Sequence, residues 1–255
     1  MRAYLTAEWG KAVARPYYRI YLAVMVALAA ALALIWWWTG REGMFQGSFG
    51  ECMSLLIPFF SAGIYLAVIV ADAVFSDQYK AGTLKNEVSY GIPRERIYLG
   101  KLATAAVAGL LLVFLTLLAY AVLCRLLIPA GPEDWQAIQT FLFRLLAAVP
   151  LWLGALALTM AVMFNIAHTI PMMVIVLTIL MGLGPTLRGM MGLGTGWLAD
   201  WAEVLYRLTL TAPMDLGAVS LWDPAYLLWC WGVGLLWTAG CTAVGLALFA
   251  RRDIH

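Results

Sequence analysis

Long apolar segments separated by shorter polar ones run through the whole chain. A helix of ~20 apolar residues crosses the ~30 Å hydrocarbon core of a membrane, and it satisfies its backbone polar groups internally. Six apolar segments have about this length, so each is predicted to be a membrane-spanning helix. The predicted spans are residues 18–38, 52–75, 102–128, 141–165, 170–187 and 226–250.

A short helix is predicted ahead of the first span. Leu5, Trp9 and Val13 recur at four-residue spacing within residues 2–15, which places them on one face of a helix. A helix of this kind lies in the interfacial region of the bilayer. Pro16 ends it, because proline has no backbone N–H to donate.

A second amphipathic segment is predicted between the fifth and sixth spans, within residues 188–225. Its apolar and charged residues separate onto two faces of a helix, so we expect an amphipathic or re-entrant helix at the outer surface. The apolar face carries Trp197, Leu198, Trp201, Leu205 and Leu208, and the polar face carries Asp200, Glu203 and Arg207.

Small residues predict close helix packing in two of the spans. Ala105 and Gly109 lie four residues apart in the third span, and Ala239, Ala243 and Ala247 repeat the same spacing in the sixth. Small side chains at this spacing let two membrane helices approach closely.

The distribution of Lys and Arg predicts the orientation in the membrane. Six spans place both termini on one side, and eleven of the 16 basic residues lie on that side, in the amino terminus, in the loop between the second and third spans and in the carboxyl tail. The other five are Arg41, Arg125, Arg144, Arg188 and Arg207. Because basic residues favour the cytoplasmic side, both termini and residues 76–101 are predicted to be cytoplasmic.

The composition excludes several classes of protein. Hydrophobic residues make up 64% of the chain and charged residues 12%, which excludes a soluble domain of this length. The net charge of +2 provides no basic surface for nucleic acid, and the four cysteines lack metal-ligand spacing, so neither nucleic acid nor metal is expected. Without repeats or linkers, residues 1–255 are predicted to form one all-α domain embedded in the lipid bilayer.

The most polar stretch of the chain, residues 75–101, joins the second and third spans. Gly82 and Thr83 can end one helix and cap the next, because glycine tolerates left-handed backbone and a threonine hydroxyl accepts a hydrogen bond from an amide at a helix start. A short helix is therefore predicted over residues 84–90. A Gly-Ile-Pro sequence then breaks it, and a further helix runs into the third span.

This loop resembles that of the ABC-2 type permeases, the six-helix transmembrane subunits of ABC exporters. The matching residues are Phe75, Asp77, Gly82, Thr83, Lys85, Asn86, Gly91, Arg94 and Lys101. The resemblance extends to the amino-terminal helix, the outer segment and a tail that contains Phe249, Arg251, Arg252, Asp253 and Ile254. In outline the chain is similar to short permeases of Gram-positive bacteria, including those for bacitracin or lantibiotic resistance.

The resemblance implies a function and a set of partners. Residues 82–93, which include Pro93, would form a coupling helix that seats in an ABC ATPase subunit. The chain has no Walker A sequence and no cofactor of its own, so ATP and Mg would be bound by that partner. A second copy or a sister permease would complete the translocation path in the inner membrane of a bacterium. Hydrophobic or antimicrobial peptides would be the cargo.

Two other classes of function remain as alternatives. One is a proton- or ion-coupled carrier or a channel, although the spans offer few polar residues to line a pore. The other is an intramembrane enzyme, for which Asp72, Asn165 and His168 are candidate residues. Because the chain lacks metalloprotease and serine-protease motifs, it is predicted not to be an enzyme.

Overall fold

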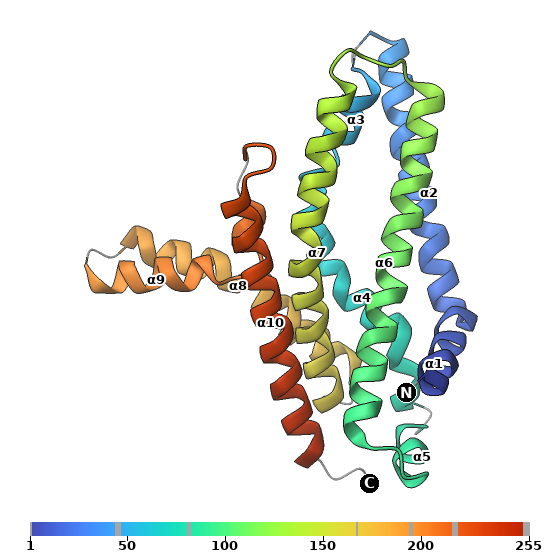
Figure 1. Ribbon diagram of the computed structural model, residues 1–255, viewed down its shortest axis with the longest axis vertical. Helices are drawn as coiled ribbons and strands as arrows, with labels where there is room; N and C mark the ends of the chain where they lie inside the picture. The colour runs from blue at the N-terminus through green and yellow to red at the C-terminus, as the bar shows by residue number, and fades with distance from the viewer. Residues whose placement is uncertain are drawn as a thin grey trace.

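The structure is a bundle of helices. The computed structural model describes residues 2–43, 47–80, 83–166, 168–193, 196–215 and 219–251, with the side chains of residues 2, 75–80 and 83–85 left outside that description. All regular elements in these ranges are helical (Figure 1). They are α1 (Arg2–Ala14), α2 (Pro16–Arg41), α3 (Phe49–Ser54), α4 (Phe59–Lys80), α5 (Thr83–Ser89), α6 (Arg94–Leu127), α7 (Asp134–Asn165), α8 (Thr169–Leu193), α9 (Trp197–Arg207), the 3₁₀ turn η1 (Ala212–Asp215) and α10 (Pro224–Arg251).

Several of these helices can cross a membrane. Within the described ranges, five helices are long and apolar enough to do so, namely α2, α6, α7, α8 and α10. They cover the first, third, fourth, fifth and sixth predicted spans. The apolar part of α4, Phe59–Val74, is shorter than these spans. The chain is therefore a multi-pass membrane protein, and α4 occupies most of the second predicted span.

The structure differs from the prediction in the second span. Residues 52–75 were expected to form one helix, but α3 ends at Ser54 and α4 begins only at Phe59. The four residues between them form tight turns, in which the Leu56 and Ile57 amides donate to carbonyls three residues earlier. The cause is Pro58, which donates no backbone hydrogen bond and disfavours helical geometry in the residue before it.

Helix α7 lies at the centre of the bundle. In its most apolar stretch 72% of the residues are buried, compared with 22% in α10 and 11% in α2. Helix α10 lies on one side of α7, while α6 and α2 lie side by side on the other (Figure 1). Helices α8 and α9 pack on each other and project sideways. Because α1, α5 and the last turn of α10 gather at one end of the bundle, we call this the terminal end.

Glycines bring α10 close to α7. A β-carbon at Gly234 would collide with the backbone of Pro150 on α7, so only glycine allows this approach. The alanine face predicted for close packing in the sixth span does not make this contact, since Ala239, Ala243 and Ala247 are exposed in the chain. In the third span the prediction is confirmed: Ala105 is buried and Gly109 lies against Trp152.

Candidate functional site: the braced segment between α4 and α6

A tight reversal of the chain over residues 90–93 connects α5 to α6 at the terminal end, and we call it the α5 turn. The Tyr90 amide donates to the Asn86 carbonyl over 2.9 Å, and the Gly91 amide donates to Val88 over 3.0 Å. Gly91 has a φ of +77°, a left-handed conformation that favours glycine at the end of a helix. Pro93 then precedes the first turn of α6. The predicted break in the helix is thus made by a glycine turn followed by a proline.

The residues predicted for this site have different surroundings. Asn86, Gly91 and Pro93 are exposed, Arg94 is half-buried and Lys101 is buried. Gly82 lies outside the described residues, as do the side chains of the remaining three predicted residues, which are Asp77, Thr83 and Lys85. The exposed residues form a surface at the α5 turn. Arg94 and Lys101, both on α6, attach this surface to the neighbouring helices.

Lys101 connects three helices through buried hydrogen bonds. Its side chain is only 1% exposed. Its Nζ atom donates to Oε2 of Glu8 on α1 over 2.9 Å and to Oε1 of Glu87 on α5 over 3.2 Å. The two carboxylate side chains are 4% and 12% exposed. Since a buried charge is tolerated only when it is paired and hydrogen-bonded, this ammonium fixes α5 against α1 and α6.

Two further side chains complete the cluster. The Nζ atom of Lys11 donates to Oε1 of Glu8 over 2.6 Å and lies 3.6 Å from Oε1 of Glu87. The hydroxyl of Tyr4 donates to Oε2 of Glu87 over 3.0 Å. The charges of the two lysines and two glutamates balance. We call Tyr4, Glu8, Lys11, Glu87 and Lys101 the brace.

The charges in the brace shift the pKa of Glu8 and of Lys11. Burial alone raises the pKa of Glu8, but Lys101 and Lys11 outweigh this effect and hold the pKa below its usual value. Burial also lowers the pKa of Lys11, and its hydrogen bond to Glu8 reverses the direction, so the pKa is raised. Glu8 and Lys11 therefore stay ionised as a pair near neutral pH.

Arg94 ties the same segment to the carboxyl end of α10. Its Nη1 atom donates to the carbonyls of Phe249 and Ala250 over 2.9 and 2.7 Å. These carbonyls lie in the last described turn of the helix, and a cation there complements the helix dipole. The guanidinium also lies 5.8 Å from the centre of the Phe249 ring.

Aromatic packing supports this contact from inside the bundle. The ring of Tyr98 lies 4.6 Å from that of Phe164 on α7, and Phe164 lies 4.8 Å from Phe249 on α10. A β-carbon at Gly245 would collide with the Tyr98 hydroxyl group. Helices α6, α7 and α10 therefore pack against one another at the terminal end, next to the α5 turn.

Sequence reasoning missed four members of the brace, namely Tyr4, Glu8, Lys11 and Glu87. The available signal was Glu8, a carboxylate within a helix otherwise predicted to be basic and interfacial. Its partner Lys101 lies 93 residues away, and no local pattern predicts such a pairing.

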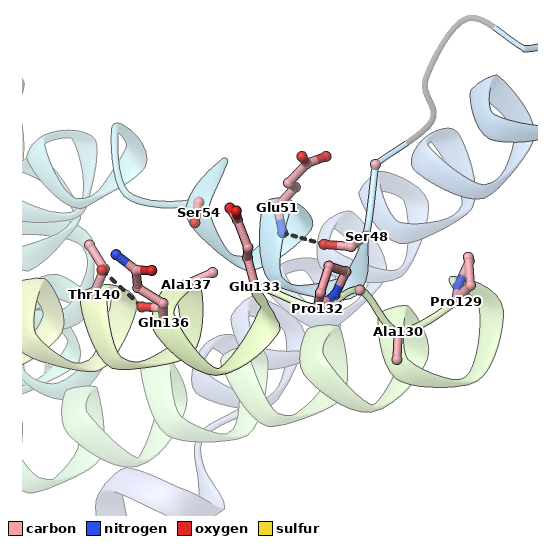
Figure 2. A pocket seen from close by; sticks show the side chains of 12 residues that line it. Ser48, Glu51, Ser54, Pro129, Ala130, Pro132, Glu133, Gln136, Ala137 and Thr140 are labelled. Atoms are coloured by element: carbon pink, nitrogen blue, oxygen red, sulfur yellow. Dashed lines mark hydrogen bonds between the residues drawn. The ribbon is translucent and has the colours of Figure 1, made fainter.

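A polar hollow of about 650 Å³ lies at the opposite end of the molecule (Figure 2). Asp134 shapes it by accepting hydrogen bonds from the Gly50 amide over 2.7 Å and from the Gly131 amide over 3.0 Å. Glu51 and Glu133 are among the residues that line it. The described part of the chain contains no group of three or more potential metal ligands, there or elsewhere.

Comparison with known proteins identifies the family. The family model described as ABC-2 family transporter protein matches residues 4–184, which run from α1 into α8 and include the whole brace. No curated protein matches the chain. Because the match covers well over half of the sequence, the chain belongs to the ABC-2 transporter family and is a membrane permease, a transport component without catalytic activity of its own.

Proposed function

We propose that the chain is the permease subunit of an ATP-driven ABC exporter. In this proposal, residues 82–93 receive the mechanical force that a separate ATPase subunit exerts. The observation that carries the proposal is the combination of an exposed α5 turn with the buried brace behind it. A segment that only joins two spans needs no buried ion pairs to α1, whereas a segment that transmits force needs a stiff connection to the helices it moves.

The contacts of α5 and α6 indicate how a force applied to α5 would be transmitted to the other helices of the bundle. Displacement of α5 acts on α6 and α1 through Glu87 and Lys101, and it acts on α10 through Arg94. Packed helices and buried ion pairs resist bending, so the terminal end moves as a unit. ATP and Mg are bound and used by the partner subunit. This chain supplies the coupling segment, and together with a second copy or a sister permease it forms the translocation path for the substrate.

The proposal also specifies the membrane in which the permease lies and the class of molecule that it transports. Both termini and the brace lie on the cytoplasmic side of a bacterial inner membrane, where the ATPase can reach them. Hydrophobic or antimicrobial peptides are the cargo class, because the resemblance to resistance permeases and the apolar interior both favour it.

Replacement of single glycines tests the coupling role. The permease is co-purified with its ABC ATPase, reconstituted in vesicles and assayed for ATP-dependent peptide transport. Gly91→Ala distorts the α5 turn, since φ is +77° there, without a clash, because no described atom comes within 4 Å of the added methyl group. We expect transport to fall severalfold while the ATPase remains bound.

Gly43→Ala is the matched control. Gly43 also has a positive φ, +72°, and equally open space among the described residues, but it follows α2 at the opposite end. Equal losses in both variants would contradict a coupling role for the α5 turn. Transport that continues without ATP or the ATPase would instead favour an ion-coupled carrier.

A further inference from the structure

An apolar cavity of about 390 Å³ lies between α2, α4, α6 and α7. Its inner wall includes Val70, Leu112 and Trp152, all of them buried. Its lining also includes Leu28 and Phe59, whose side chains are 60% and 59% exposed. The cavity therefore reaches from the interior of the bundle to its outer surface.

The position of the cavity determines what can enter it. Three of its four helices, α2, α6 and α7, are long and apolar enough to span the membrane, so the cavity lies at the depth of the hydrocarbon. Apolar cavities exclude water. Its volume falls within the range of sites that hold small molecules or hydrocarbon chains. The bilayer itself supplies molecules of that kind.

Two buried hydroxyl groups in the lining, those of Tyr21 and Thr116, limit further which ligand can bind. The hydroxyl of Tyr21 is buried and finds no hydrogen-bond partner among the described residues. Tyr21 lies in the second turn of α2, close to the end of the helix at which a span meets the interface. Ester oxygens of membrane lipids lie at that depth, and they accept hydrogen bonds from hydroxyl groups.

We propose that the cavity binds one acyl chain of an ester-linked membrane lipid, with the Tyr21 hydroxyl donating a hydrogen bond to the ester carbonyl. The acyl chain enters past Leu28 and Phe59 and lies against Trp152. Lipid binding at this site requires neither ATP nor an ATPase. It can therefore be tested on the permease alone, and its outcome is independent of the proposed coupling role.

Photo-crosslinking locates the bound chain directly. The permease is reconstituted in phosphatidylglycerol and phosphatidylethanolamine vesicles with a trace of phosphatidylcholine that carries a diazirine on one acyl chain. After irradiation, adducts are mapped by mass spectrometry. We expect adducts on the buried wall, at Leu112 and Trp152, in addition to those on outward residues such as Val244. Adducts confined to outward residues would overturn the proposal.

A filled cavity provides the second test. Gly63 lines the cavity, and a β-carbon there meets no described atom within 4 Å, so Gly63→Leu adds side-chain volume to this space. Gly232→Leu is the matched control, because Gly232 has the same open surroundings on α10, away from the cavity. Labelling of Trp152 should fall severalfold in the first variant only. Unchanged labelling in Gly63→Leu would contradict binding.

Ether lipids test the hydrogen bond. A dialkyl phosphatidylcholine probe lacks the ester carbonyl, so the unmodified protein should take up the diacyl probe in preference to it. Tyr21→Phe should abolish that preference. Thr116→Val is the control, since it removes another buried hydroxyl of the cavity that the proposal does not assign to the ester. A preference that survives in Tyr21→Phe would exclude the assigned hydrogen bond.

Discussion

The Nζ atom of Lys101 on α6 lies 2.9 Å from Oε2 of Glu8 on α1, and both side chains are almost fully buried. This pair joins a helix that precedes the first span to the beginning of the third. The α5 turn is attached to both through Glu87. The terminal end of the permease is therefore a single cross-braced unit.

Removal of the central ammonium should destabilise this unit strongly. In Lys101→Met, two buried carboxylates lose their shared partner, and breaking a buried pair from one side costs about 3–5 kcal/mol. We expect a clear drop in the thermal unfolding midpoint in detergent. Lys11→Met is the control, because Lys11 is 52% exposed and exposed ion pairs contribute about 0–1 kcal/mol. Similar losses in the two variants would contradict the central position of Lys101.

The stability contribution of Glu8 should depend on pH. Its pKa is lower in the folded protein than in the unfolded chain, so its contribution is complete above the unfolded value of about 4.3 and is lost as the pH falls through the folded value. The difference in unfolding midpoint between the unmodified protein and Glu8→Gln should be largest near neutral pH. It should shrink below about pH 4.3. A difference that stays constant across this window would argue against ionised Glu8.

Arg94 should hold the last turn of α10 in place. Arg94→Ala removes two charged hydrogen bonds to the carbonyls of Phe249 and Ala250, each worth about 1.5–3 kcal/mol. Amide hydrogen exchange in residues 246–251 should become faster, and exchange at the start of α10 should not change. Arg96→Ala, which alters an exposed neighbour, should leave both regions as they were. Protection that persists in Arg94→Ala would rule out this anchor.

The contact between α7 and α10 should tolerate no side chain at Gly234. Gly234→Ala places a methyl group against the Pro150 backbone, and overpacking of this kind costs about 1–3 kcal/mol. Gly232→Ala has no described neighbour within 4 Å and should be neutral or slightly stabilising, since alanine favours helix over glycine by about 1 kcal/mol. Thermal unfolding of both variants checks the contrast. Equal stability would show that the helices can separate at no cost.

Local patterns accounted for much of the helical layout. Runs of apolar residues predicted where α2, α6, α7, α8 and α10 lie, and the Gly-Ile-Pro sequence predicted the break between α5 and α6. Pro16 and Gly91 act through backbone geometry, which depends on the residue itself and its near neighbours. Pro58 acts in the same way, yet the apolar run around it concealed the break between α3 and α4.

The sequence by itself therefore determined the class of protein, the approximate positions of its helices and the segment that resembles a coupling helix. Only the tertiary structure decided that Glu8 and Glu87 share Lys101, and that Gly234 rather than the alanine face of α10 meets α7. The physical reason is the range of the interactions. Helix formation and helix breaking are local, whereas a buried ion pair or a close helix contact depends on residues that the chain brings together from distant positions.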